Sequence, residues 1–214
     1  MPDGSPPARR SRDPEATRLG ILDAALQEFS DNGLSGARVD AIAARTRTTV
    51  RMIYYYFGSK EELYRAVLER AYAAMRATEA GLRLNELPPV DAIRRLAEHT
   101  FDHHEANPRF IRLVSIENIH RAEHLLQSPV IEAMNKQVLA TIAAVLDRGQ
   151  ADGTFQAGAT PMQVHLLITA FCFFRVANRH TLGAVFRQDP LDPALRAGQR
   201  DMLVRSVLEY LRRA

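Results

Sequence analysis

Cationic and hydroxyl side chains gathered between residues 38 and 60 have the chemistry for binding phosphate. The charged residues of this segment are Arg38, Asp40, Arg45, Arg47, Arg51 and Lys60. They give it a net charge of +4, in a chain whose total charge is only +3. Arg and Lys neutralise nucleic-acid phosphates, and hydroxyl groups donate hydrogen bonds to them. The charge distribution therefore directs a nucleic acid to this part of the chain.

Within this segment, residues 48–51 combine helix-capping hydroxyls with a group that can contact bases. Thr48 and Thr49 precede a predicted helix, where a Thr49 hydroxyl can act as the cap and free N–H groups suit a phosphate oxygen. Arg51 can donate two hydrogen bonds to guanine, whereas Val50 offers apolar contact to a thymine methyl group. We expect Arg51 to make the base contact.

Two short predicted helices, near 39–45 and 49–56, position these residues. They are separated by only a few residues, which is the geometry of a helix-turn-helix. In that motif the second helix enters the major groove of double-stranded DNA with its first residues at the base edges. Lys60 opens the next helix beside a Ser59/Glu62 capping box, where its ammonium group can reach a phosphate.

Helix start signals recur along the rest of the chain as a capping residue followed by proline. They are Asp13-Pro14, Asn107-Pro108, Ser128-Pro129, Thr160-Pro161 and Asp192-Pro193. With the helical spacing of apolar residues, they predict an all-α protein of about nine helices. The predicted helices lie near residues 14–31, 39–45, 49–56, 60–84, 90–106, 108–123, 129–148, 161–180 and 193–213.

Residues 39–64, VDAIAARTRTTVRMIYYYFGSKEELY, resemble the DNA-binding half of the TetR family of transcriptional regulators, most specifically in IYYYFGSKEEL. The resemblance spans about residues 14–63 and implies a ligand-responsive homodimer on a palindromic operator, most often a repressor that a small organic effector releases. It also implies that Tyr54 and Tyr55 bind the phosphate backbone through their hydroxyls. Residues 116–125, IENIHRAEHL, resemble more weakly the subgroup around the pyrimidine-utilisation regulator.

Three positions depart from the family pattern. Arg47 stands in the turn where glycine is usual, and positive φ at a residue other than glycine costs about 1 kcal/mol or more. Arg38 replaces the usual Ser or Thr, which removes a cap but offers a cation to phosphate. Val50 stands where Lys is frequent. The operator sequence therefore does not follow from these residues.

The predicted domains are a disordered basic arm at 1–12, a helix-turn-helix domain at 13–60 and a ligand-binding and dimerisation domain at 61–214. Homodimerisation is expected through the last two helices, because 161–180 is apolar on nearly all sides. A DNA-binding organiser without an effector is an alternative.

Candidate effector contacts are residues, mostly polar, on otherwise apolar helix faces. Glu117 shares a stripe with Phe110 and Val114, and a buried carboxylate needs a partner. That partner is Arg121, another buried cation or a ligand. For Phe171 and Arg175 the alternative is core or interface packing, and for His104 it is a satisfied core histidine. The candidates are Met75, His104, Glu117, Asn118, Arg121, His165, Phe171 and Arg175.

Other chemistry is less well supported. His99/His103 and His120/His124 have an i, i+4 spacing that can hold a metal, which makes a metal-responsive regulator an alternative, although we predict no metal and no cofactor. Neither a repeated carboxylate–histidine pair nor a phosphate loop points to an enzyme. We expect a cytoplasmic protein outside the membrane for three reasons. The chain has one cysteine, Cys172, its first residues contain no signal-peptide core, and its longest apolar run has only about 14 residues.

Overall fold

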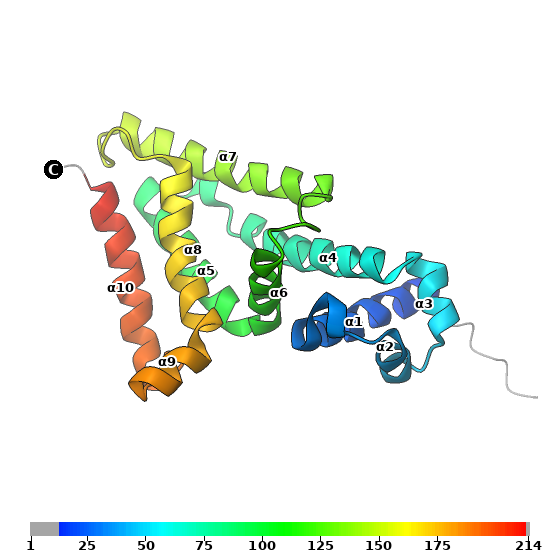
Figure 1. Cartoon of the computed structure of the whole chain (residues 1–214). Helices are drawn as coiled ribbons and strands as arrows, with labels where there is room; N and C mark the ends of the chain where they lie inside the picture. Colours follow the sequence, from blue (N-terminus) through cyan, green and yellow to red (C-terminus); the bar gives the residue numbers. More distant parts are fainter. Residues whose placement is uncertain (1–12, 213–214) are drawn as a thin grey trace, which may run out of the picture. The chain divides into compact units, whose positions relative to one another are not determined.

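The computed structural model describes residues 13–212, so the basic arm predicted at residues 1–12 lies outside the described residues. In the described part the chain forms ten α-helices and one short 3-10 helix, and no strand (Figure 1). The all-α prediction is confirmed. The elements are α1 (Pro14–Gly36), α2 (Val39–Thr46), α3 (Val50–Phe57), α4 (Lys60–Ala80), η1 (Leu84–Glu86), α5 (Pro89–Ala106), α6 (Pro108–Ile119), α7 (Pro129–Ala151), α8 (Pro161–Ala177), α9 (Arg179–Phe186) and α10 (Pro193–Leu211).

The chain divides into two compact units, one ending at Val67 and the other beginning at Leu68. The division falls inside α4, a little beyond the domain boundary that we predict after residue 60. The reason is that the first turns of α4 belong to the first unit: the Tyr64 ring packs edge-on against Phe29, with 5.0 Å between the ring centroids.

The first unit is built from α1, α2, α3 and the start of α4. Asp13 caps α1 by accepting a hydrogen bond from the Glu15 N–H at 3.0 Å, and Pro14 takes the first helical position, as predicted. The buried residues of this unit recur at helical spacing on each helix. They include Ile21, Leu22, Ala25, Phe29, Ile42, Ile53, Phe57, Leu63 and Tyr64.

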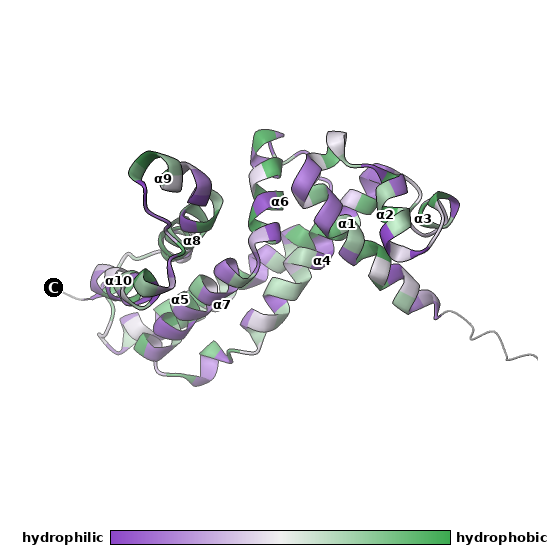
Figure 2. Ribbon diagram, turned by 90° about the horizontal axis from the view of Figure 1, so that it is seen from below, coloured by the Kyte–Doolittle hydropathy of each residue, from purple (hydrophilic) through white to green (hydrophobic). Residues whose placement is uncertain are grey.

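In the second unit, α5 is the central helix and contacts α7, α8 and α10. Apolar and polar segments alternate along α4 and α5, as expected for amphipathic helices (Figure 2). One hydrophobic core joins α5, α7, α8 and α10. Among its fully buried members are Ala92, Ala97, Phe101, Val164, Cys172, Val207 and Leu211.

Helix boundaries differ from the predictions where the backbone turns. α6 ends at Ile119 rather than 123, because Arg121 and Ala122 have φ of 58° and 59°, which a right-handed helix cannot contain. The helix predicted at 161–180 ends at Ala177, and a separate helix, α9, follows it. The prediction of about nine helices is therefore one short, because no proline follows Asn178 and its side chain makes no capping hydrogen bond at the start of α9.

The turn between α2 and α3 has the strain that its sequence predicts. Arg47 is the C-cap of α2 and lies in the left-handed region at φ 51° and ψ 34°, with its N–H bonded to the Ala43 carbonyl. This is the position where the family usually has glycine, which adopts positive φ without a steric cost. With arginine the turn keeps the left-handed conformation, at the steric cost of a Cβ atom in that region.

Replacing Arg47 with glycine is expected to raise the free energy of unfolding by about 1 kcal/mol, because it removes the Cβ clash of the left-handed conformation. Urea unfolding of the two proteins measures the difference. Arg47→Ala is the matched control, since it removes the same side chain but keeps Cβ. Equal stability of the glycine and alanine variants would show that the turn is not strained.

Candidate nucleic-acid interface and effector cavity

The start of α3 presents the residues predicted to meet DNA. Thr49 is the N-cap, and its hydroxyl accepts a hydrogen bond from the Met52 N–H at 3.2 Å. Ile53 and Phe57 bury the inner face of the helix. The opposite face is exposed, with Tyr55 79% exposed and Tyr54 40% exposed. Both side chains are therefore exposed, as a contact to phosphate requires.

Arg51 on the first turn of α3 is also exposed. Within residues 13–212 it has neither a hydrogen bond nor an ion pair, so its guanidinium keeps all its donors for an external partner. Val50 beside it is half-buried. The third tyrosine, Tyr56, is half-buried and contacts Tyr55 edge-on with ring centroids 5.6 Å apart.

Two of the predicted phosphate contacts already have partners in the first unit. The Arg38 guanidinium pairs with Asp40 at 2.6 Å, which raises the pKa of Arg38 and lowers the pKa of the Asp40 carboxyl. Lys60 Nζ donates to the Ser35 carbonyl at 3.4 Å. Both side chains would have to exchange these contacts for a phosphate, whereas Arg51 would not.

Glu28, which was not among the predicted site residues, is a buried carboxylate that connects α1 to α2. It is 4% exposed and accepts hydrogen bonds from the Arg38 N–H at 3.1 Å and from Asn32 Nδ2 at 3.0 Å. Arg45 pairs with it at 3.4 Å. Glu28 thus replaces the N-cap that Arg38 cannot supply, and it holds both ends of α2. In the sequence, its burial is indicated only by its position one residue before Phe29, on the apolar side of α1.

The second unit contains a cavity of about 330 Å³ formed by α4, α5, α6, α7 and α8. Four of the eight predicted effector residues line it: Met75, His104, Asn118 and His165. The structure adds lining residues that sequence analysis missed, including Tyr72, Arg76, Phe110, Asn135 and Phe173. The lining combines aromatic and aliphatic side chains with several polar ones, a composition that suits a small-molecule site.

Glu117 and Arg121 lie outside this cavity. Glu117 is 1% exposed, and its carboxylate accepts hydrogen bonds from the backbone N–H groups of His124 and Leu125, both at 3.2 Å, and pairs with His124 Nδ1 at 3.1 Å. The Glu117–Arg121 pair is therefore wrong, because the positive φ of Arg121 turns the chain so that the carboxylate meets backbone donors instead. Glu117 stabilises the turn after α6 through these hydrogen bonds.

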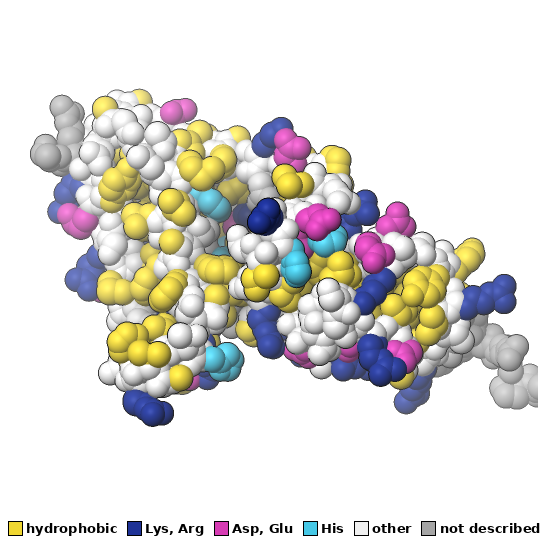
Figure 3. Space-filling model, viewed as in Figure 1, with side chains coloured by type: hydrophobic (Ala, Val, Ile, Leu, Met, Phe, Trp, Pro, Cys, Tyr) yellow, Lys and Arg dark blue, Asp and Glu magenta, His cyan; other side chains and the backbone are white. Residues whose placement is uncertain are grey.

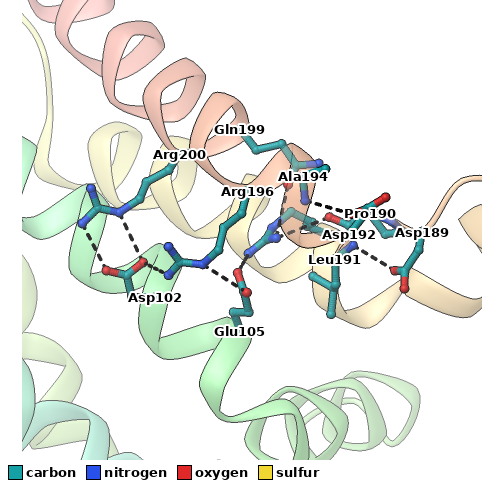
Figure 4. Close-up of polar contacts among 11 residues, drawn as sticks. Asp102, Glu105, Asp189, Pro190, Leu191, Asp192, Ala194, Arg196, Gln199 and Arg200 are labelled. Carbon is teal, nitrogen blue, oxygen red and sulfur yellow. Dashed lines mark hydrogen bonds and ion pairs between the residues drawn. The ribbon is translucent and has the colours of Figure 1, made fainter.

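Arg175 and Phe171 also lie outside the cavity, in the junction of α5, α8 and α10. Arg175 is 4% exposed, pairs with Glu105 at 2.6 Å and lies over the Phe101 ring at 3.9 Å, while Phe171 stacks on that ring with centroids 6.4 Å apart. Figure 4 shows Asp102 and Glu105 of α5 facing the arginines of α10. The core alternative thus accounts for both residues. The neighbouring ion pairs are Arg196 to Asp102 and Glu105, and Arg200 to Glu98 and Asp102.

The cavity histidines are neutral at neutral pH. Burial, and then the neighbouring His103, lower the pKa of His104 to about 4. Burial, and then Arg76, also lower the pKa of His165. In the described residues no three His, Cys, Asp or Glu side chains lie close enough to hold a metal ion, and His99 of the i, i+4 pair contacts the Thr78 hydroxyl at 3.2 Å.

Two descriptions of known protein families match the chain, one in each unit. The family description "Bacterial regulatory proteins, tetR family" matches residues 21–67, and "Tetracyclin repressor-like, C-terminal domain" matches residues 89–207. The chain belongs to the TetR family. Its members are transcriptional regulators that bind DNA through the helix-turn-helix, which confirms the predicted family and function class.

Individual relatives of this TetR-family chain match between about half and nearly all of it. The HTH-type transcriptional repressor NicS of Pseudomonas putida is 34% identical over 204 residues, covering 95% of this chain and 96% of that protein. RutR of Escherichia coli is 32% identical over 118 residues, or 55% of each protein. The transcriptional regulator SCO4942 of Streptomyces coelicolor has a TM-score of 0.69 at 29% identity, covering 92% of this chain and 99% of that one.

The buried histidine makes stability depend on pH. Unfolded His104 binds a proton near pH 6.5 and folded His104 only near pH 4, so the unfolded state binds more protons between these values. The free energy of unfolding is therefore expected to fall as the pH drops through this window. The slope should be smaller in His104→Asn and unchanged in the control His180→Asn on exposed α9. Denaturant unfolding at stepped pH values measures it, and equal slopes in all three proteins would refute it.

Proposed function

We propose that this chain is a homodimeric cytoplasmic repressor that binds a palindromic operator through α3 and releases it when a small organic effector occupies the cavity of the second unit. The observation that carries the DNA-binding part is Arg51 on the exposed first turn of α3, which has no partner within residues 13–212. The cavity, with its aromatic walls and two neutral histidines, supports the effector part and disfavours an organiser without an effector.

The proposed DNA contacts divide into two kinds. Arg51 donates to a base edge and Val50 contacts an apolar base surface, because both lie on the turn that enters the groove first in this motif. Thr48, Thr49, Tyr54 and Tyr55 bind phosphates through hydroxyl or N–H groups. Arg38 and Lys60 join them as cations after exchanging their present partners. These last contacts strengthen binding without selecting sequence.

Exposed apolar side chains support the dimer through α8 and α10, the last two helices of the prediction. They gather over α8, α9 and α10 in Figure 3. Leu166 is 61% exposed and Phe174 is 54% exposed, on a helix that is apolar on nearly every side. A contiguous apolar surface of this kind marks a protein contact. The residues are Met162, Leu166, Phe174, Val185, Phe186, Leu195, Met202 and Tyr210.

Placement in the cytoplasm away from membranes follows from the regulator function and agrees with two features. Cys172 is buried, and burial raises the pKa of its thiol to about 12, so it is inert as a core residue. α7 has the length and hydropathy of a membrane span, yet Ile142, Val145 and Leu146 on it pack in the core of the second unit.

The operator sequence can be identified by selecting the DNA fragments that the protein binds. Purified protein should recover a short palindrome from fragments of the source genome at about 150 mM salt, where nonspecific electrostatic binding is already weakened. Arg51→Ala should bind that palindrome more weakly by about 1–3 kcal/mol and relax the preference at one base pair in each half-site. Fluorescence anisotropy on wild-type and base-substituted operators measures both effects.

Arg112→Ala, an exposed arginine of the second unit, is the matched control and should leave operator affinity unchanged. Wild-type affinity in Arg51→Ala would overturn the base contact. Recovery of no enriched sequence would overturn the operator part of the proposal.

The dimer surface can be tested by adding one charge to it. Leu166→Glu should raise the dimer dissociation constant at least about tenfold, because a carboxylate would be buried without a partner between the two copies. Leu126→Glu is the control, since Leu126 is 82% exposed in the turn between α6 and α7. Analytical ultracentrifugation measures both, and a dimer of Leu166→Glu as tight as wild type would place the interface elsewhere.

A further inference from the structure

Arg76 of α4 lies between two cavities of the second unit and lines both of them. The larger cavity, of about 490 Å³, is also lined by the charged residues Glu79, Arg83 and Glu86, so charges of both signs face it. In the smaller cavity, of about 330 Å³, Arg76 is the one charged side chain among the lining residues. Since His104 and His165 are neutral there, the guanidinium of Arg76, which is paired with Glu79, is the one charged group that lines this smaller cavity.

The donors of Arg76 are only partly used. One terminal nitrogen, Nη1, pairs with Glu79, and the other, Nη2, donates to Asn135 Oδ1 of α7 at 3.0 Å. The remaining nitrogen, Nε, is buried and has no hydrogen-bond partner in the described structure. A buried N–H group without a partner destabilises the folded protein, and an acceptor placed beside it would remove that cost.

His104 brings a second unsatisfied polar atom to the same cavity. Its side chain is almost completely buried at 3% exposure, and its Nδ1 has no partner within residues 13–212. His104 comes from α5 and Arg76 from α4, so two residues that line one cavity each have a buried nitrogen without a hydrogen-bond partner in the described structure. A polar ligand in this cavity would lie close to both residues.

The walls of the cavity favour a flat ligand. Phe110 of α6 and Phe173 of α8 line it, and Tyr72 packs edge-on against Phe110 with ring centroids 5.2 Å apart. Rigid aromatic side chains of this kind contact another ring over a large area. The volume of about 330 Å³ lies near the lower end of the range for small-molecule sites, which suits a compound with one ring.

Resting on the proposed function above, we propose that the effector is a small planar aromatic acid whose carboxylate binds Arg76 and whose ring contacts Phe110 and Phe173. A polar ring substituent meets His104. A cationic ligand is excluded because no carboxylate lines this cavity. A neutral ring could accept a hydrogen bond from the guanidinium but would not form the stronger pair of opposite charges that a carboxylate forms.

Isothermal titration calorimetry of the full-length protein tests this with benzoate and the monohydroxybenzoates as probes, each against its primary amide. At least one carboxylate should bind, and its amide should bind at least about tenfold more weakly, because a hydrogen bond to a charged group is lost. Octanoate, which has the same charge on a flexible chain, should also bind at least about tenfold more weakly.

Arg76→Gln should abolish the preference for acid over amide, while Arg83→Gln should keep it, because Arg83 lines only the larger cavity and pairs with Glu86 at 2.6 Å. Arg76→Lys retains the positive charge but lacks the planar guanidinium, so it should keep part of the preference for acid over amide. It is the variant to use if Arg76→Gln fails to fold. An unchanged preference in a folded Arg76 variant would overturn the proposal.

The panel itself gives the other decisive outcomes. An amide or octanoate that binds as tightly as the best aromatic acid overturns the ligand class. Absence of binding by every aromatic acid, in protein that still binds its selected operator, also overturns it and leaves the repressor function standing. Failure to select any operator instead counts against the repressor function, whatever the calorimetry shows.

Discussion

The buried guanidinium of Arg175 is the interaction on which the arrangement of the second unit depends. Removing a charge from water is costly unless it is paired and hydrogen-bonded, and here Glu105 of α5 pairs with it while Gln199 of α10 accepts at 3.2 Å. These contacts can form only when α5, α8 and α10 hold one rotation about their axes. Because His104 precedes Glu105 on α5, the same rotation directs His104 to the cavity, so a network outside the proposed effector site fixes one wall of it.

Glu28 has the equivalent role in the first unit. Its carboxylate is satisfied by α1 and by both ends of α2, which fixes how the two helices meet. α3 then follows through a turn whose strain at Arg47 is borne by the surrounding contacts. The buried carboxylate of Glu28 therefore finds its partners within this unit. That leaves the exposed Arg51, which lacks a partner within the described residues, and the exposed hydroxyl of Tyr55 free to bind something else.

Local signals in the sequence predicted most of the helices and the motif that contacts DNA, because caps, prolines and the αL turn act within a few residues. Thr49 capping α3 and Thr160 with Gln163 capping α8 are examples. Long-range partners were not predictable in this way. Glu117 was recognised as a carboxylate needing a partner, yet the partner is a turn created by positive φ at two later residues. Arg76 was missed because, on α4, it resembles any other arginine until α5, α7 and α8 enclose it.

α8 is apolar on nearly all sides, and not along one stripe only, because it faces three different surroundings. Ile168 and Cys172 face the core, His165 and Phe173 line the cavity, and Phe174 lies exposed on the proposed dimer surface. Three surroundings on three sides demand apolar residues nearly all round, which removes the amphipathic pattern from the sequence. Leu166 belongs to two of these sides, because it lines the cavity and is also mostly exposed. A ligand in the cavity and a second copy of the chain on α8 would therefore contact the same side chain, which offers a direct route for coupling the two binding events.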